Sequence, residues 1–471
     1  MLTSGPVGYE IGGNLDATCF GGIAAMHRLV TKLGLVEGID QRLQLLKVHL
    51  PYHESDHVLN LAYNVLCGGT RLEDIERLRH DTAYMNALGA DLIPDPTTAG
   101  DFCRRFAEAD VVELMETINT VRPTLWAGRG RDLLGEIAYL DADGTIVPTD
   151  GQCKQGMDMS YKGIWGYAPL IVSLANTKEV LYLVNRPGNA PSHQDAAGWI
   201  DKAIDLVVPH TERVCLRGDT DFSLTAHFDR WAERVDFVFG MDNSTPLRAN
   251  AERLDEDCWQ RLERPERESL TGQIRARPDN VKQQIVTERG YLDLRLDYED
   301  VAEFDYQPGK CGRTYRVVAL RKNISKSRGD QALIEEIRYF FYITTRTDLT
   351  ADQVVACANQ RCDQENIIGQ LKSGIHALRV PLYDLMANWA YMVIAALAWN
   401  IKAWFAMMMH RKADRREYLK MEFRRFLNGI ILIPALVTRR ARSITVRLIG
   451  YRPTMDRLFS AWRTIDRTRF G

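Results

Sequence analysis

The chain has 471 residues, of which 45% are hydrophobic, and its 60 Lys and Arg nearly balance its 62 Asp and Glu. This length predicts roughly two to four domains, and the composition is that of a soluble globular protein rather than a disordered or membrane protein. No basic segment followed by an apolar run opens the sequence, so we expect no secretory signal. The nine cysteines form no CxxC pair, which favours free thiols in a reducing cytoplasm.

The first 133 residues predict helices. Apolar residues recur at spacings of three and four over residues 57–67 and 72–88, which is the period of an amphipathic helix. Arg104 and Arg105 would project from a further helix that begins near residue 97. We therefore expect a helical domain with a basic edge over residues 1–133.

The pattern changes near residue 135. Residues 192–208 and 223–234 have helical periodicity and lie between runs with strand chemistry. Strands that first follow one another and then alternate with helices predict a mixed α/β sheet. The runs, each bounded by Gly, Pro, Asn or Asp, are residues 136–145, 168–176, 180–186, 213–219 and 235–241.

The alternation stops after residue 241. Residues 243–336 begin polar and then contain two β-like stretches, so we predict a β-rich insertion there. Strand chemistry resumes at residues 337–345, and residues 352–410 have a helical pattern. Within them the apolar run 389–399 is shorter than the ~20 residues of a spanning helix. We therefore expect a buried core helix and no membrane segment.

Positive charge gathers at the end of the chain. Residues 401–471 hold 17 Lys and Arg against 5 Asp and Glu, so the first 400 residues carry a net charge of −14. A basic segment on an acidic body is typical of nucleic-acid binding. Solvated helix faces would have the same composition.

Two aspartates end a predicted strand. Asp141 and Asp143 are two residues apart in the run 136–145, hence on the same side of the sheet. Burying such a pair is costly unless a cation compensates the charge. A turn in which Asp143 caps Thr145 is the alternative.

A second carboxylate group follows the strand at 213–219. Catalytic and ligand-binding groups gather at the carboxyl ends of strands in open α/β sheets, which favours Asp219 as a metal ligand. Asp221 has the character of a carboxylate at a helix N-terminus, and the choice between the two stays open.

The third group is Arg361, Glu365 and Lys372, which share one face at 100° per residue if the segment is one α-helix. An ordinary Arg–Glu pair is the alternative. Three carboxylates can hold two Mg²⁺ or Mn²⁺ ions through their oxygen atoms, and two such ions can catalyse phosphoryl transfer. The sequence contains no phosphate loop, nucleophile elbow, H-E-x-x-H or dinucleotide fingerprint that would favour another chemistry.

Together these groups resemble the DDE transposases of bacterial insertion sequences, in the branch whose ribonuclease H-like core is interrupted by a β-strand insertion. The run Asp143-Gly144-Thr145 is similar to that family's Asp-x-Thr strand end. Arg217 to Phe222 is similar to its Arg-x-Asp-Ser-Gly-Phe turn, with Asp221 in place of glycine.

The family's Tyr-x2-Arg-x3-Glu-x6-Lys signature is matched by Arg361, Glu365 and Lys372, with Ala358 in place of tyrosine. The resemblance implies a catalytic and metal-binding triad of Asp143, Asp219 and Glu365 with two Mg²⁺ or Mn²⁺ ions. It also implies cut-and-paste transposition on double-stranded DNA, with terminal inverted repeats and target DNA bound by a homodimer in a synaptic complex. The protein would be cytoplasmic and associate with the bacterial nucleoid. A stand-alone endonuclease, or a retired transposase that only binds DNA, is the alternative.

On this interpretation basic and amide side chains near the carboxylates, on the glutamate segment and in the basic tail contact DNA. Tyr161 and Trp165 stand among them, and we expect these two in the core. The predicted DNA-binding residues are Arg361, Lys372, Lys154, Gln155, Lys162, Arg186, Asn189, His193, Arg439, Arg440, Arg442 and Arg447.

The resemblance predicts four parts. They are a helical DNA-binding or dimerisation domain (1–133), a ribonuclease H-like catalytic core (134–242 and 337–380), a β-rich insertion (243–336) and a helical basic domain (381–471).

Overall fold

The computed structural model describes residues 9, 15–151, 153–264, 267–268, 274–275, 285–288, 292–328 and 331–470. It divides into two compact units. The helical unit comprises Met1–Thr124, Ser373–Ala377 and Ala390–Gly471, and the sheet unit comprises Leu125–Lys372 and Leu378–Trp389. The four-part division expected from the sequence remains a prediction.

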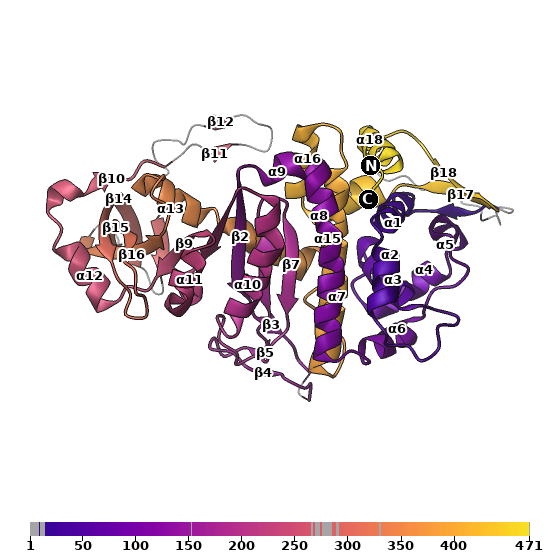
Figure 1. Ribbon diagram of the computed structural model, residues 1–471, viewed down its shortest axis with the longest axis horizontal. Helices are drawn as coiled ribbons and strands as arrows, with labels where there is room; N and C mark the ends of the chain where they lie inside the picture. Colours follow the sequence, from indigo (N-terminus) through magenta and orange to yellow (C-terminus); the bar gives the residue numbers. More distant parts are fainter. Residues whose placement is uncertain are drawn as a thin grey trace. The chain divides into compact units, whose positions relative to one another are not determined.

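The sheet unit is built on a ten-stranded sheet with the order β10-β14-β15-β16-β9-β8-β2-β6-β7, and β13 pairs with β14. The short strands are β10 (Gln260–Arg261) and β13 (Ile285–Glu288). Figure 1 labels β2, β7, β9, β10, β14, β15 and β16 of this sheet. The neighbours β2, β8 and β9 are parallel, whereas β6 and β7 add to one side as antiparallel strands. The mixed α/β character predicted from the sequence is confirmed. The central strands are β2 (Ile137–Gly144), β6 (Leu170–Leu174), β7 (Glu179–Val184), β8 (Arg213–Gly218) and β9 (Asp236–Met241).

Long strands from the predicted insertion continue this same sheet. β14 (Leu292–Tyr306), β15 (Tyr315–Arg328) and β16 (Gln331–Thr344) form antiparallel pairs. β16 then pairs with β9, so the predicted core strand and part of the insertion are one continuous strand. Several residues of the predicted insertion lie outside the described ranges.

Two helices cover the central strands. α10 (Ala196–Val207) packs on β2, β6 and β7, and α13 (Ala351–Asn359) packs on β9, β14, β15 and β16. Side chains alternate along β2, so Leu140 faces the α10 side and Tyr139 faces the α13 side. Asp141 and Asp143 have the parity of Tyr139, and they therefore point to the α13 side.

The segment with Arg361, Glu365 and Lys372 is not one regular α-helix. α13 ends at Asn359, α14 covers Cys362–Gly369, and a π-helical turn η8 covers Gln370–Gly374. The expectation of one regular α-helix is therefore wrong, because a π-helical turn begins before Lys372. Arg361 lies at the N-cap of α14, one turn before Glu365.

The helical unit combines the N-terminal helices with the basic C-terminal region. The N-terminal helices are α1 (Ile23–Lys32), α2 (Leu35–Arg42), α3 (Glu54–Leu66), α4 (Ile75–Arg79), α5 (Thr82–Leu88), α6 (Pro96–Cys103) and α7 (Glu108–Thr120). Later come α16 (Lys412–Lys420), α17 (Phe423–Phe426), a π-helical turn η9 (Leu427–Ile431) and α18 (Pro453–Arg467). The hairpin β17 (Ala435–Arg440) and β18 (Ser443–Leu448) completes a small sheet with β1 (Ala17–Thr18).

The apolar run near residue 390 belongs to α15 (Leu385–Met407). Its 23 residues are enough, by length and composition, to cross a membrane, so the helix extends well beyond the apolar run 389–399. All of its most apolar window is buried inside the protein, as a core helix requires. The expectation of a buried helix is confirmed.

Candidate active site

Two of the predicted carboxylates meet because their strands are parallel neighbours. Asp143 is the second-to-last residue of β2, and Asp219 follows β8 directly. The carboxyl ends of parallel strands lie at one edge of a sheet, which brings the two side chains together. Asp219 also accepts a hydrogen bond from the backbone N–H of Asp221 (3.1 Å) and so caps a short 3-10 turn, Thr220–Phe222.

Arg361 lies between all three predicted carboxylates. Its Nη1 is 2.9 Å from Oδ2 of Asp143 and 3.9 Å from Oδ2 of Asp219, and its Nη2 is 3.7 Å from Oε1 of Glu365. One positive charge is thus shared among three negative ones. The Arg361, Asp143 and Asp219 side chains are partly buried, whereas Glu365 is 60% exposed.

Burial raises the pKa of both aspartates. Removal from water raises the pKa of Asp143 from 3.8 to about 7; Arg361 opposes the shift and Asp219 adds to it. Burial also raises the pKa of Asp219, opposed by Arg361 and reinforced by Asp221. Asp143 therefore exchanges its proton near neutral pH, which marks this edge as a candidate functional site.

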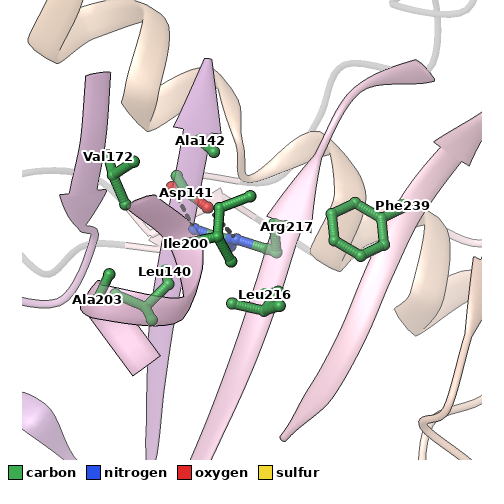
Figure 2. Close-up of a pocket in the computed structure, with 9 residues that line it drawn as sticks. All are labelled: Leu140, Asp141, Ala142, Val172, Ile200, Ala203, Leu216, Arg217 and Phe239. Carbon is green, nitrogen blue, oxygen red and sulfur yellow. Dashed lines mark hydrogen bonds and ion pairs between the residues drawn. The ribbon is translucent and has the colours of Figure 1, made fainter. Parts of the chain in front are cut away.

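Asp141, two residues earlier on β2, has a different environment. Both of its oxygens accept hydrogen bonds from Arg217, at 2.7 Å from Nε and 2.8 Å from Nη2 (Figure 2). The two side chains are almost completely buried, and the Arg217 guanidinium lies 4.5 Å from the centre of the Tyr139 ring. Burial alone would lower the pKa of Arg217, but Asp141 raises it.

Arg217 also connects the sheet to α13. Its Nη1 lies 3.4 Å from the carbonyl oxygen of Cys357 and 3.4 Å from Oε1 of Gln360. Since Gln360 is the residue before Arg361, this buried pair supports the backbone from which the Arg361 side chain extends.

Gln364, which the sequence reasoning did not single out, anchors α14 on the other side. Its side chain is fully buried; Nε2 donates to the carbonyl oxygen of Ile171 (3.1 Å), and Oε1 accepts from the Ser173 hydroxyl. Ile171 is the register partner of Asp143 in the β2–β6 pair. Gln364, the residue before Glu365, is therefore bonded to the residue opposite Asp143 in the sheet. A glutamine is an ordinary helix residue, so no local pattern marks it.

Next to Asp143 lies an open cavity of about 390 Å³ within the sheet unit. Its wall includes Lys162, Arg186 and Lys372, three of the predicted DNA-binding residues. Tyr161 also lines it and is 79% exposed, and Trp165 nearby is 50% exposed, so the expectation that both are core residues is wrong.

The cavity's cations differ in their own partners. Arg186 is 5% exposed and binds the carbonyl oxygens of Ala168, Ser192 and Gln194, and burial lowers its pKa to about 10. Across the ranges that the structure describes, its Nη2 has no hydrogen-bond partner. Burial and the neighbouring Lys162 lower the pKa of Lys372, and Asp143 opposes the shift.

The remaining predicted DNA-binding residues of the sheet unit are scattered around this edge. Lys154 donates to the carbonyl oxygen of Val380, so its charge is used inside the protein. Oε1 of Gln155 accepts from the backbone of Leu385 (3.2 Å). Asn189 and His193 are exposed in the loop after β7.

In the helical unit the predicted tail arginines belong to the β17–β18 hairpin. Arg439 is paired with Asp91 (2.7 Å) and contacts the carbonyl oxygen of Ala90. Arg440, Arg442 and Arg447 are exposed.

The donor chemistry of the carboxylate cluster fits a hard divalent cation. Asp143, Asp219 and Glu365 offer only oxygen, the donor that Mg²⁺ and Mn²⁺ prefer. Their charge already attracts one cation, the guanidinium of Arg361. In the residues that the structure describes, no three His, Cys, Asp or Glu side chains stand at metal-binding separations as they lie. A metal would therefore have to compete with Arg361 for the same oxygens.

Comparison with known proteins identifies the family of the chain. The family model described as Transposase DDE domain group 1 matches residues 10–470. No curated protein matches the sequence. Among solved structures, the chain is similar to a piggyBac transposase in a synaptic complex with hairpin DNA. That match has 12% identity and a TM-score of 0.37, and it covers 85% of this chain and 81% of the other.

Proposed function

The chain belongs to the group 1 family of DDE transposase domains, and from this premise we propose that it cleaves and joins DNA through Asp143, Asp219 and Glu365. The observation that carries the proposal is the convergence of these side chains, from two strand ends and one helix, on the single guanidinium of Arg361. Such an excess of negative charge at the open edge of a sheet is suited to binding divalent cations.

Two Mg²⁺ or Mn²⁺ ions held by this triad would activate water or a 3′-hydroxyl as nucleophile and stabilise the leaving 3′-oxygen. Asp143 and Asp219 would hold cations as fixed anions once Asp143 has lost its proton. Glu365, the most exposed of the three, would close the ligand set from the helix side. We assign the ligand role to Asp143 rather than Asp141, because both oxygens of Asp141 are already bound by Arg217.

The cavity beside Asp143 suits a DNA strand. Lys162 and Lys372 would bind phosphate oxygens, the contacts that position a nucleic acid. Arg186 would join them only after a shift of its side chain, because its Nη2, without a partner among the described residues, is buried. The exposed Tyr161 and Trp165 rings would stack on bases. We keep Gln155, Asn189 and His193 as contacts of the same region, and withdraw Lys154, since it is bound to Val380.

The finer assignment follows the resemblance. We propose a ribonuclease H-like core in the sheet unit and cut-and-paste transposition of a bacterial insertion sequence. Terminal inverted repeats and target DNA would be bound by a homodimer in a synaptic complex, inside the cytoplasm.

The test is cleavage of a labelled duplex that carries the element end, with and without Mg²⁺. Asp143→Asn, Asp219→Asn and Glu365→Gln should each abolish cleavage while duplex affinity and thermal midpoint stay near wild type. The loss should exceed the roughly 10–100-fold typical of residues that only support a metal ligand. Cleavage at the wild-type rate by any one variant would remove that residue from the triad.

The same reaction separates the alternatives. A transposase joins the cleaved 3′ end to a second duplex, whereas a stand-alone endonuclease releases cut ends only. A protein that binds the element end but neither cuts nor joins it in Mg²⁺ or Mn²⁺ would be a retired transposase.

A further inference from the structure

A second cationic surface lies in the helical unit, on the C-terminal segment. An open groove of about 670 Å³ runs between the α17–η9 segment and the start of α18. Its wall carries three exposed arginines, together with the neutral hydrogen-bonding side chains of Asn428 and Thr454. The arginines are Arg424, Arg425 and Arg452.

These arginines have little of their charge matched inside the protein. Within the described part of the chain, no carboxylate lies at ion-pair distance from Arg424 or Arg452. Arg425 is 3.4 Å from Glu417, and both side chains are solvent-exposed enough for that pair to be weak. Glu422 is the acidic residue of the groove wall, so the wall keeps an excess of two positive charges.

We propose that this groove binds the phosphate backbone of duplex DNA, as a contact separate from the cavity beside Asp143. The proposal rests on the proposed function, which makes DNA the polyanion this protein meets. Arginine forks with Asn and Thr side chains are the groups that proteins direct at phosphate oxygens. Contacts to phosphates carry no sequence information, so the strength of this contact should be independent of DNA sequence.

The ion pairs favour this groove over Arg439 of the β17–β18 hairpin as a phosphate contact. Arg439 already has Asp91 as its partner, and a phosphate would have to displace that carboxylate. Arg424 and Arg452 need give up only water. The unmatched positive charge of the groove is therefore available to bind phosphates and release counterions from DNA.

The experiment measures duplex affinity of the full-length protein across a range of salt concentrations without divalent cations. The triple variant Arg424→Ala, Arg425→Ala, Arg452→Ala should lower the slope of log K against log salt by up to about 2.7, at 0.9 per lost phosphate contact. The control triple removes the same charge from exposed positions at and after the end of α18: Arg463→Ala, Arg467→Ala, Arg469→Ala. It should change the slope much less.

A further variant with lysine at all three groove positions should keep most of the wild-type slope, since it keeps the charge. Equal slopes for the groove and control triples, with unchanged thermal midpoints, would overturn the proposal. Mg²⁺-dependent cleavage by the wild type is scored on the same duplex. If the wild type cleaves and the groove triple binds like wild type, only the groove assignment falls. If the wild type neither binds nor cleaves any duplex, the proposed function falls with it.

Discussion

Two ion-pair clusters, each with carboxylates around one arginine, begin at aspartates two residues apart on β2, and they balance their charges differently. Asp141 faces one arginine, Arg217, and both partners are buried with two hydrogen bonds between them. Asp143 shares its arginine, Arg361, with Asp219 and Glu365. The first cluster is complete in itself, whereas the second carries more negative charge than its cation offsets.

The contrast separates a structural ion pair from a site that attracts further cations. A buried carboxylate with both oxygens bound has nothing left to offer a ligand. A partly exposed carboxylate with a raised pKa gains from any cation that approaches. Two aspartates two residues apart on one strand can therefore have different roles although they share chemistry and point to the same side of the sheet.

Removing one charge of the buried Asp141–Arg217 pair should have the largest effect on the stability of the folded protein. Asp141→Asn leaves the guanidinium of Arg217 buried without a counter-charge. Such a change typically lowers the free energy of unfolding by roughly 3–5 kcal/mol. Chemical denaturation should show the loss for Asp141→Asn and little change for Asp143→Asn.

A paired replacement sharpens that result. Asp141→Leu with Arg217→Met removes both charges, so it should recover part of the stability lost in Asp141→Asn. If Asp141→Asn instead unfolds like wild type but cannot cleave DNA, the two aspartates have been assigned the wrong way round.

The second prediction concerns Gln364, which ties α14 to the strand beside Asp143. Gln364→Ala removes its bonds to Ile171 and Ser173 and loosens the position of Glu365. We expect cleavage to fall by roughly 10–100-fold and the Mg²⁺ concentration for half-maximal rate to rise, as for other residues that orient metal ligands. Duplex affinity measured without metal should not change.

The control is an exposed residue of the same helix, Asn366. Asn366→Ala makes the same kind of truncation at a surface position and should have a small effect. A Gln364→Ala protein that needs no more Mg²⁺ than wild type would have lost stability only, and Gln364 would not position Glu365.

The central strands and both aspartates at their ends could be predicted because their signals are local. The apolar runs at 136–145 and 213–219 correspond to β2 and β8 within one or two residues. The helix predicted over residues 223–234 is shorter, and α11 covers only Phe228–Ala232. Ser223 and Leu224 have non-helical backbone angles after the turn that Asp219 caps, so the periodic pattern begins before the helix does.

The charge pairing could not be predicted in the same way. Asp141 meets Arg217 because β2 and β8 are parallel with these two residues in register, and register depends on the whole sheet. The shared position of Arg361 depends on where α13 ends and α14 begins. Gln364 has a functional setting only through β6, which is nearly two hundred residues earlier. Each of these contacts joins segments whose spacing in the sequence carries no signal.

The third prediction tests the incomplete charge balance through pH. Between 3.8 and about 7 the folded protein keeps a proton on Asp143 that the unfolded chain releases. This group therefore favours folding at low pH, and its contribution is lost as pH rises toward 7. Without divalent cations, the thermal midpoint of wild type should fall more between pH 5 and pH 7.5 than that of Asp143→Asn.

Mg²⁺ binding should show the same proton. Because the metal binds the ionised carboxylate, the Mg²⁺ concentration for half-maximal cleavage should rise below pH 7, by at most about tenfold per pH unit. Calorimetry in buffers of different ionisation enthalpy would detect the released proton. A Mg²⁺ requirement that is constant from pH 5.5 to pH 8 would mean that Asp143 is ionised throughout.

The smallest expected effect extends the comparison of matched and unmatched charge to the β17–β18 hairpin. Arg439 is paired with Asp91, whereas Arg440, Arg442 and Arg447 are exposed on the same hairpin. Single alanine variants of Arg440, Arg442 and Arg447 should each reduce the salt slope of duplex binding by about 0.9 if they contact phosphates. Arg439→Ala should change it least, because its charge is already offset, and Asp91→Asn should raise affinity slightly by releasing Arg439. A larger change for Arg439→Ala than for the other three would show that DNA displaces Asp91 from Arg439. An ion pair within the protein would then not predict which arginines contact DNA.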